Sequence, residues 1–195
     1  MQIDVAGTAD LPQAAADRLA AVLHTETGKP VSFRAGRRLA GHGQQCWSQQ
    51  DIKAAGDANR QVHTGGTIVT LYVLSLDATS CDDANIVGLA YGASNMLVYT
   101  AAARRAAPAT VSPERIVEAV IIHELGHILG LVNVGYRSPT NHEDTDHPGH
   151  SSNPKSVMYW QLERGNLIQQ LVAGPPLTFD SNDEADLAAV RDGKL

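Results

Sequence analysis

The segment HELGH at positions 123–127 constrains this chain more than any other feature, because it lies inside the apolar run IVEAVIIHELGHILGLV. Residues four apart on a helix share one face, so His123 and His127 are expected to present their imidazoles side by side, as a tetrahedral Zn²⁺ requires. Glu124, one step round the helix, is placed to take a proton from zinc-bound water, whose pKa the metal lowers to about 7. The segment therefore predicts a helix with two metal ligands and a general base.

The same residues have a structural explanation, in which both histidines are core residues with hydrogen-bond partners. The neighbouring side chains are apolar and predict a helix buried on most sides: Ile121, Ile122, Leu125, Ile128 and Leu129. Two unpaired imidazoles and a carboxylate would be costly in such a place, and a bound metal removes that cost. We therefore favour the zinc site.

Length and charge narrow the remaining choices. The chain of 195 residues is expected to form a single domain spanning 1–195, which can bury about 70% of its unfolded surface without a structural metal. A metal is therefore expected to be catalytic. The formal net charge of -6 and the lack of long Lys/Arg runs argue against a nucleic-acid partner. No stretch approaches the roughly 18 apolar residues of a membrane span, so none is expected.

The compartment is left open by composition. Residues 1–13 lack the basic and apolar regions of a signal peptide. The two cysteines, Cys46 and Cys81, could form one disulfide, sit reduced in the core or be free, and their number alone does not decide between these states.

Hydrophobic periodicity, together with capping and turn residues, predicts the secondary structure. Helical spacing and capping residues predict helices over 11–27, 48–59, 113 to about 130, and 181–191. Runs rich in β-branched and aromatic residues predict strands over 31–35, 67–76, 86–92 and 96–100. The polar segment 131–155 has no period, and a loop of that length in a compact domain is usually functional.

The run HELGHILGL resembles the metzincin pattern HExxHxxGxxH, to which His123, Glu124, His127 and Gly130 correspond. The pattern's last histidine falls on Asn133, whose neutral amide is a weaker zinc ligand than imidazole. Further along, HSSNPKSVMYW at 150–160 resembles the matrixin segment in which the third histidine precedes the methionine of the Met-turn.

This second resemblance implies that His150 is the third ligand and that Met158 is the methionine of the Met-turn, with an insertion between the glycine turn and His150. Archaemetzincins show a related arrangement with two cysteines, and Ser151 and Ser156 stand at those positions here. The role of such cysteines is therefore absent.

The inserted loop offers other ligands, of which His147 is the main rival to His150 and Asn133 the second. The remaining candidates of the cluster NHEDTDH are His142, Glu143, Asp144 and Asp146. The cluster could instead be a solvated acidic loop, a lid over the cleft or a second metal site. A different class of zinc peptidase uses a downstream glutamate, for which Glu163 or Glu184 could be proposed, but Met158 in its matching context argues against that class.

The resemblance implies an α+β, zincin-like fold, with a twisted mixed sheet and helices above a cleft and a loop-rich lower part that holds the Met-turn and a final helix. Metzincins bind an extended peptide along an edge strand. The segment GLAYGA at 88–93 resembles that strand, so Gly88, Leu89 and Ala90 would contact a peptide or protein substrate, although a plain interior strand explains them equally well. Tyr159 and Trp160 would wall the pocket beside the metal, or are core aromatics.

The implied activity is that of a secreted endopeptidase with one catalytic Zn²⁺, in which Glu124 assists the attack of zinc-bound water on a peptide bond. Two other functions share these parts. One is a catalytically silent binding module that keeps the zinc fold, although the intact Glu124 does not favour it. The other is a zinc hydrolase that acts on a non-peptide amide or ester.

Overall fold

A five-stranded sheet, with its strands in the order β2-β1-β4-β7-β6, forms the framework of the computed structural model, which describes residues 1–41, 45–168 and 171–194. Neighbouring strands are parallel except for β6, which runs antiparallel to β7. The strands are β1 (Gln2–Gly7), β2 (Ser32–Arg38), β4 (Thr70–Leu76), β6 (Gly88–Tyr91) and β7 (Asn95–Tyr99). Every residue of β4 is buried, as expected of a central strand covered on both faces.

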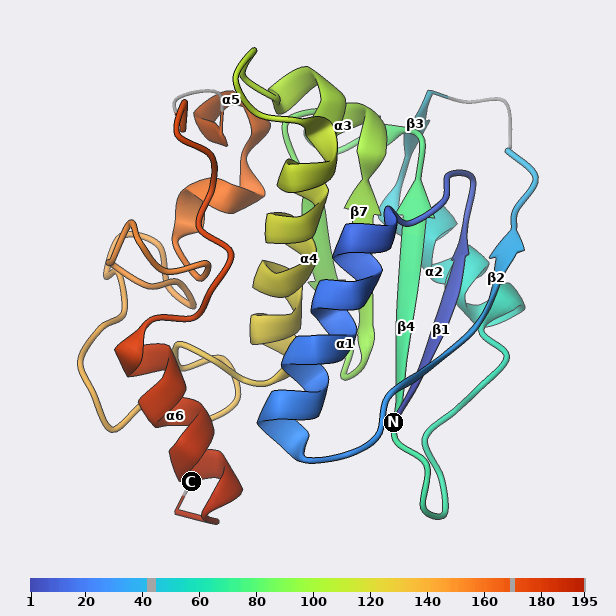
Figure 1. The fold of residues 1–195 in the computed structure, drawn as a ribbon. Coiled ribbons are helices and arrows are strands. Elements are labelled where there is room, and N and C mark those ends of the chain that lie inside the picture. The colour runs from blue at the N-terminus through green and yellow to red at the C-terminus, as the bar shows by residue number, and fades with distance from the viewer. Residues whose placement is uncertain (42–44, 169–170, 195) are drawn as a thin grey trace.

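Helices cover both faces of this sheet (Figure 1). On one face, α1 (Gln13–Thr27) packs against α4 (Pro113–Ile128), and α2 (Gln49–Asn59) lies on the other. α4 begins at Ser112, whose hydroxyl accepts a hydrogen bond from the Arg115 amide, and a proline occupies its first turn. The helix that carries HELGH therefore starts at a well-defined cap and runs across the sheet.

The lower part of the molecule is rich in loops. After α4, the chain from 131 to 155 contains no helix and no extended strand, as predicted, and then returns beneath α4. The shorter elements are β3 (Cys46–Trp47), β5 (Thr79–Ser80), α3 (Thr100–Ala106), the 3₁₀ helix η1 (Trp160–Glu163), α5 (Gly165–Ile168) and α6 (Ser181–Arg191). Buried apolar residues of the upper and lower parts belong to one cluster.

The segment that follows η1 is joined to the strand edge just before β6. The amide of Gly165 donates to the carbonyl oxygen of Asn85 at 2.7 Å, and the amide of Val87 donates to the carbonyl oxygen of Glu163 at 3.2 Å. The two segments thereby form an isolated antiparallel bridge. This pairing fixes η1 beside the start of β6.

The cysteines, left open by the sequence, form a disulfide. Cys46 in β3 and Cys81 just after β5 are bonded, with their Cα atoms 4.9 Å apart. The bond joins the chain before α2 to the loop after β4, next to the short parallel pairing of β3 with β5. It therefore ties the α2 face of the sheet to its central strand.

Most predicted helices and strands are present with small shifts in their ends. The predicted strand 67–76 begins only at Thr70, and the run 96–100 ends as a strand at Tyr99, because Thr100 already belongs to α3. β1 and α3 were not predicted. In the described residues, no helix combines the length and apolar character needed to cross a bilayer.

Candidate metal centre

Three imidazoles meet near the C-terminal end of α4. His123 and His127 come from consecutive turns of α4, with their Nε2 atoms 3.1 Å apart. The ring of His150 arrives from the loop, and its centroid lies 5.2 Å from that of His123 and 5.0 Å from that of His127. The structure therefore brings together the three histidines that the sequence predicted as ligands.

Backbone carbonyls orient two of these rings. The Nδ1 of His123 lies 2.7 Å from the carbonyl oxygen of Val157, and the Nδ1 of His150 lies 3.3 Å from that of His147 and 3.2 Å from that of Pro148. A carbonyl only accepts hydrogen bonds, so each Nδ1 must carry the proton, which leaves the Nε2 lone pair facing the cluster. The Nε2 of His150 is buried and has no hydrogen-bond partner. This donor set fits Zn²⁺.

A fourth donor, Glu163 at the end of η1, also reaches the cluster. Its Oε1 lies 3.0 Å from the Nε2 of His150, 3.4 Å from that of His127 and 3.6 Å from that of His123. Sequence reasoning had considered Glu163 only as a third ligand of another peptidase class and had set it aside. No local pattern identifies it, because its position depends on the pairing of η1 with the chain before β6.

The electrostatics of the cluster reflect burial and these contacts. Burial opposes the charge on Glu163, but its polar contacts with the three histidines outweigh that effect and hold its pKa well below the usual range. Burial lowers the pKa of His127 to about 4. For His150, burial acts in the same direction, but the contact with Glu163 prevails and raises the pKa.

Glu124 lies on the side of α4 that faces β6. Its side chain is buried, and neither carboxylate oxygen has a hydrogen-bond partner. Burial first, and then the charge of Glu163, raise the pKa of Glu124 well above its ordinary value, although the nearby Ala90 amide acts in the opposite direction. Burying a carboxylate without a hydrogen-bond partner costs free energy. Such a group with a raised pKa is typical of a residue that transfers a proton during catalysis.

The approach of Glu124 to the strand depends on Gly88. A Cβ at this position would lie 2.3 Å from Cγ1 of Val120 and 2.6 Å from Oε1 of Glu124. Any larger residue would therefore push α4 and β6 apart. Gly88 was predicted to contact substrate, and the structure shows that it also makes room for the candidate base.

The two rival ligands lie outside the cluster. The side-chain amide of Asn133 donates to Glu143 at 2.6 Å, and its oxygen accepts from the Ser138 amide at 2.6 Å. The ring of His147 stacks on Trp160 with 3.7 Å between centroids, and its Nδ1 lies 3.2 Å from Asp144. Both rivals therefore have structural partners of their own.

Met158 lies directly beneath the HELGH helix. It is buried in a tight turn, in which the Tyr159 amide donates to the carbonyl oxygen of Ser156 at 3.2 Å. A Cβ on Gly126 would come within 2.2 Å of the Met158 sulfur, so the glycine of HELGH makes room for the methionine. The resemblance had implied such a methionine, and the structure gives it a packing partner in the motif itself.

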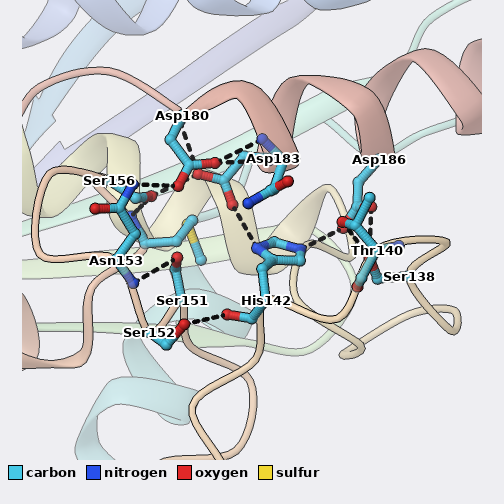
Figure 2. A network of polar contacts seen from close by, with 12 residues as sticks. Ser138, Thr140, His142, Ser151, Ser152, Asn153, Ser156, Asp180, Asp183 and Asp186 are labelled. Atoms are coloured by element: carbon cyan, nitrogen blue, oxygen red, sulfur yellow. Dashed lines mark hydrogen bonds and ion pairs between the residues drawn. The ribbon is translucent and has the colours of Figure 1, made fainter.

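A buried polar network holds the loop that delivers His150 (Figure 2). The Nε2 of His142 lies 3.0 Å from Asp186, and its Nδ1 faces Asp183 at 3.7 Å. Asp183 also accepts a hydrogen bond from Ser156, the residue that stands at a cysteine position of archaemetzincins. His142 gathers its donor atoms with those of Asp180 and Asp183, whereas the second metal site considered from the sequence lay in the loop cluster NHEDTDH and included neither aspartate. Their partners, however, make them an internal bridge between the loop and α6.

The cavity beside His150 is formed by residues after Met158, by the end of the long loop and by the chain before β6. The order of the described strands places β6 at the edge of the sheet, which is where the edge-strand reading had put Gly88, Leu89 and Ala90. Trp160 lines a cavity of about 400 Å³ together with His147, His150 and Glu163. Tyr159 is half-buried, with its ring 5.9 Å from that of Trp160.

No protein-family model and no curated protein matches this sequence. Solved structures do match. Archaemetzincin from Methanopyrus kandleri has a TM-score of 0.59 at 17% identity, over 100% of this chain and 96% of that one. Archaemetzincin from Archaeoglobus fulgidus, complexed with malonate, has a TM-score of 0.55 at 14% identity, over 95% and 99% of the two chains. The fold is archaemetzincin-like.

A third match is a zinc-dependent peptidase from Methanocorpusculum labreanum, with a TM-score of 0.58 at 14% identity, over 95% of this chain and 99% of that one. The predicted arrangement of a twisted mixed sheet with helices is confirmed by this archaemetzincin-like fold. At such low identity the likeness speaks for the fold, and the chemistry has to be argued from the site.

Proposed function

We propose that this chain is a zinc-dependent peptidase. The observation that carries the proposal is the convergence of three imidazole Nε2 atoms, from His123, His127 and His150, next to a buried and unpartnered Glu124. The archaemetzincin-like fold and its zinc-dependent relative among the solved structures support it.

The three histidines would hold one Zn²⁺, and the carbonyl contacts of His123 and His150 keep their rings in the orientation that presents Nε2. When bound, the metal supplies a nucleophile at neutral pH and polarises the substrate carbonyl. Glu124 accepts the proton of the attacking water and delivers it to the departing amine. Its raised pKa suits a group that must both take and return a proton.

The substrate of this proposal is an extended peptide or protein segment. It would add to the outer edge of β6 through backbone hydrogen bonds at Gly88 and Ala90, whose backbone groups face away from β7, since a strand edge recognises main chain independently of sequence. Trp160 and Tyr159 would form one wall of the neighbouring pocket. Both side chains combine an apolar ring with one polar group, which suits a pocket wall that contacts substrate and solvent.

The test replaces Glu124 with Gln. Zinc content should remain at one ion for each chain, because the histidines are unchanged, while hydrolysis of a casein or gelatin panel should fall by at least about a hundredfold. A chelator should abolish the wild-type activity, and added zinc should restore it.

Other outcomes decide between the functions. Tight zinc binding without cleavage of any peptide by the wild type would favour a silent binding module. Turnover of small esters or non-peptide amides, with no peptide cleavage, would favour the other hydrolase. Zinc retained by His150→Ala but lost by His147→Ala would contradict the ligand set.

We also propose an extracytoplasmic location, which the Cys46–Cys81 disulfide supports because such bonds persist mainly in oxidising compartments. Protein recovered from its natural host under acid quench should resist thiol alkylation unless it is first reduced. Recovery with two freely alkylated cysteines would contradict this location. A Cys46→Ser/Cys81→Ser variant provides the unlabelled control.

A further inference from the structure

We propose that Glu163 is a fourth protein ligand of the metal, at the vertex that an active peptidase leaves to water. This inference rests on the proposed zinc site. It adds that the site is closed in the conformation seen here and has to open before a substrate carbonyl or a water can reach the ion.

The size of the donor cluster is the first argument. Ligands about 2.0–2.1 Å from a tetrahedral zinc ion are separated from one another by about 3.3–3.4 Å. The Oε1 of Glu163 lies 3.0, 3.4 and 3.6 Å from the Nε2 atoms of His150, His127 and His123, and the last two nitrogens are 3.1 Å apart. These separations scatter around the edge of a zinc tetrahedron.

The direction of the donors is the second argument. The Nε2 of His150 makes no hydrogen bond, although the carboxylate oxygen is only 3.0 Å away. His123 and His150 each direct Nδ1 at a carbonyl oxygen, so lone pairs on their Nε2 atoms face the carboxylate. Lone pairs and a carboxylate repel each other unless a proton or a metal cation lies between them, and a single metal ion can serve all three rings and the carboxylate at once.

The main chain of Glu163 is fixed, and its side chain has room to move. The carbonyl oxygen of Glu163 accepts the Val87 amide, and the Gly165 amide donates to Asn85. The side chain itself is 33% exposed and borders the cavity of about 400 Å³ that Trp160 also lines. A rotation of this side chain would therefore open the fourth vertex and leave β6 and η1 in place.

The test compares wild type with Glu163→Gln and Glu163→Ala, and uses Glu184→Gln as the matched control because Glu184 is exposed and lies outside the cluster. Zinc affinity is measured by competition with a chromophoric chelator. The visible absorption of the Co²⁺-substituted proteins is then titrated with acetohydroxamate.

We expect both Glu163 variants to bind zinc at least about tenfold more weakly than wild type and Glu184→Gln, since a ligand is lost. The Co²⁺ spectrum should change in both variants. Acetohydroxamate should bind Glu163→Ala more tightly than wild type, because it no longer competes with a carboxylate. Unchanged circular dichroism establishes that the variants are folded.

Equal zinc affinity and identical Co²⁺ spectra in all four proteins would overturn the fourth ligand and leave the three-histidine site intact. Failure of the wild type to bind zinc or Co²⁺ would overturn both the site and this inference. Neither zinc affinity nor the Co²⁺ spectrum requires turnover. A wild type that binds zinc but cleaves no peptide would therefore contradict only the proposed function.

Discussion

Gly88 shows how closely the β6 edge and the HELGH helix approach each other. The helix places Val120 and Glu124 one turn apart on the face that touches this glycine. Because Gly88 has no side chain, the candidate base Glu124 can lie beside the strand edge on which a peptide would bind.

We expect Gly88→Ala to lower peptidase turnover by at least about tenfold, because the new methyl group would displace Glu124 or widen the gap between α4 and β6. Overpacking of this kind should also cost about 1–3 kcal/mol of stability. Zinc content should not change. Steady-state kinetics and urea unfolding measure the two effects.

Gly56→Ala is the matched control, because a Cβ there would meet no atom closer than 3.4 Å and alanine favours the helix in which Gly56 lies. It should be neutral or stabilising. Equal turnover for Gly88→Ala and wild type would show that the contact with Glu124 is not needed for catalysis.

Single residues also show where sequence reasoning succeeds and where it stops. His123, Glu124 and His127 follow from helical spacing, and the predicted start of their helix at 113 agrees with the cap at Ser112 in the structure. Glu163 was not predicted as a ligand of this site, because its approach to the histidines depends on main-chain pairing between segments far apart in the sequence. Such pairing leaves no periodic signal for a reader of the sequence to detect.

Among the elements, the long loop is held by α6. His142 is buried between Asp183 and Asp186, which project from the first turns of that helix (Figure 2). Burial raises the pKa of Asp183, although its hydrogen bond from Ser156 acts in the opposite direction. A histidine facing two buried carboxylates offsets part of the cost of their burial.

We expect His142→Asn to destabilise the protein by about 3–5 kcal/mol, because the two aspartates would lose a buried partner. The loop should loosen first, which would weaken zinc binding through His150. Urea unfolding and amide exchange of residues 131–155 measure these effects. His63→Asn, at an exposed position, is the control. An unchanged unfolding midpoint for His142→Asn would contradict the proposal that His142 anchors the loop to α6.

The elements that were predicted share strong local signals, and those that were missed lack them. The capping box at Ser48 and the left-handed Gly28 mark α2 and α1 directly. β1 is a short terminal segment that becomes a strand only by pairing with β2 and β4 on either side. Its conformation is decided by the sheet, which local periodicity does not describe.

For the whole molecule, the HELGH motif and the order of elements anticipated the arrangement that the archaemetzincin structures share. The route of the inserted loop did not follow from that resemblance. It depends on the polar bridge to α6, whose aspartates lie far from the loop in sequence. Long-range contacts of this kind are the least accessible to sequence reasoning.

The hydrogen bond between the Val87 amide and the carbonyl oxygen of Glu163 also limits the free edge of β6 at one end. The Val87 carbonyl oxygen accepts the Tyr99 amide, so in the register of β6 with β7 the backbone groups of Leu89 face β7, and those of Gly88 and Ala90 face the outer edge. The edge before Gly88 is already occupied, because the Val87 amide donates to the carbonyl oxygen of Glu163. In the proposed function, a peptide paired with this edge would therefore meet the protein's own backbone at Val87, so its pairing with β6 would have to end at Gly88.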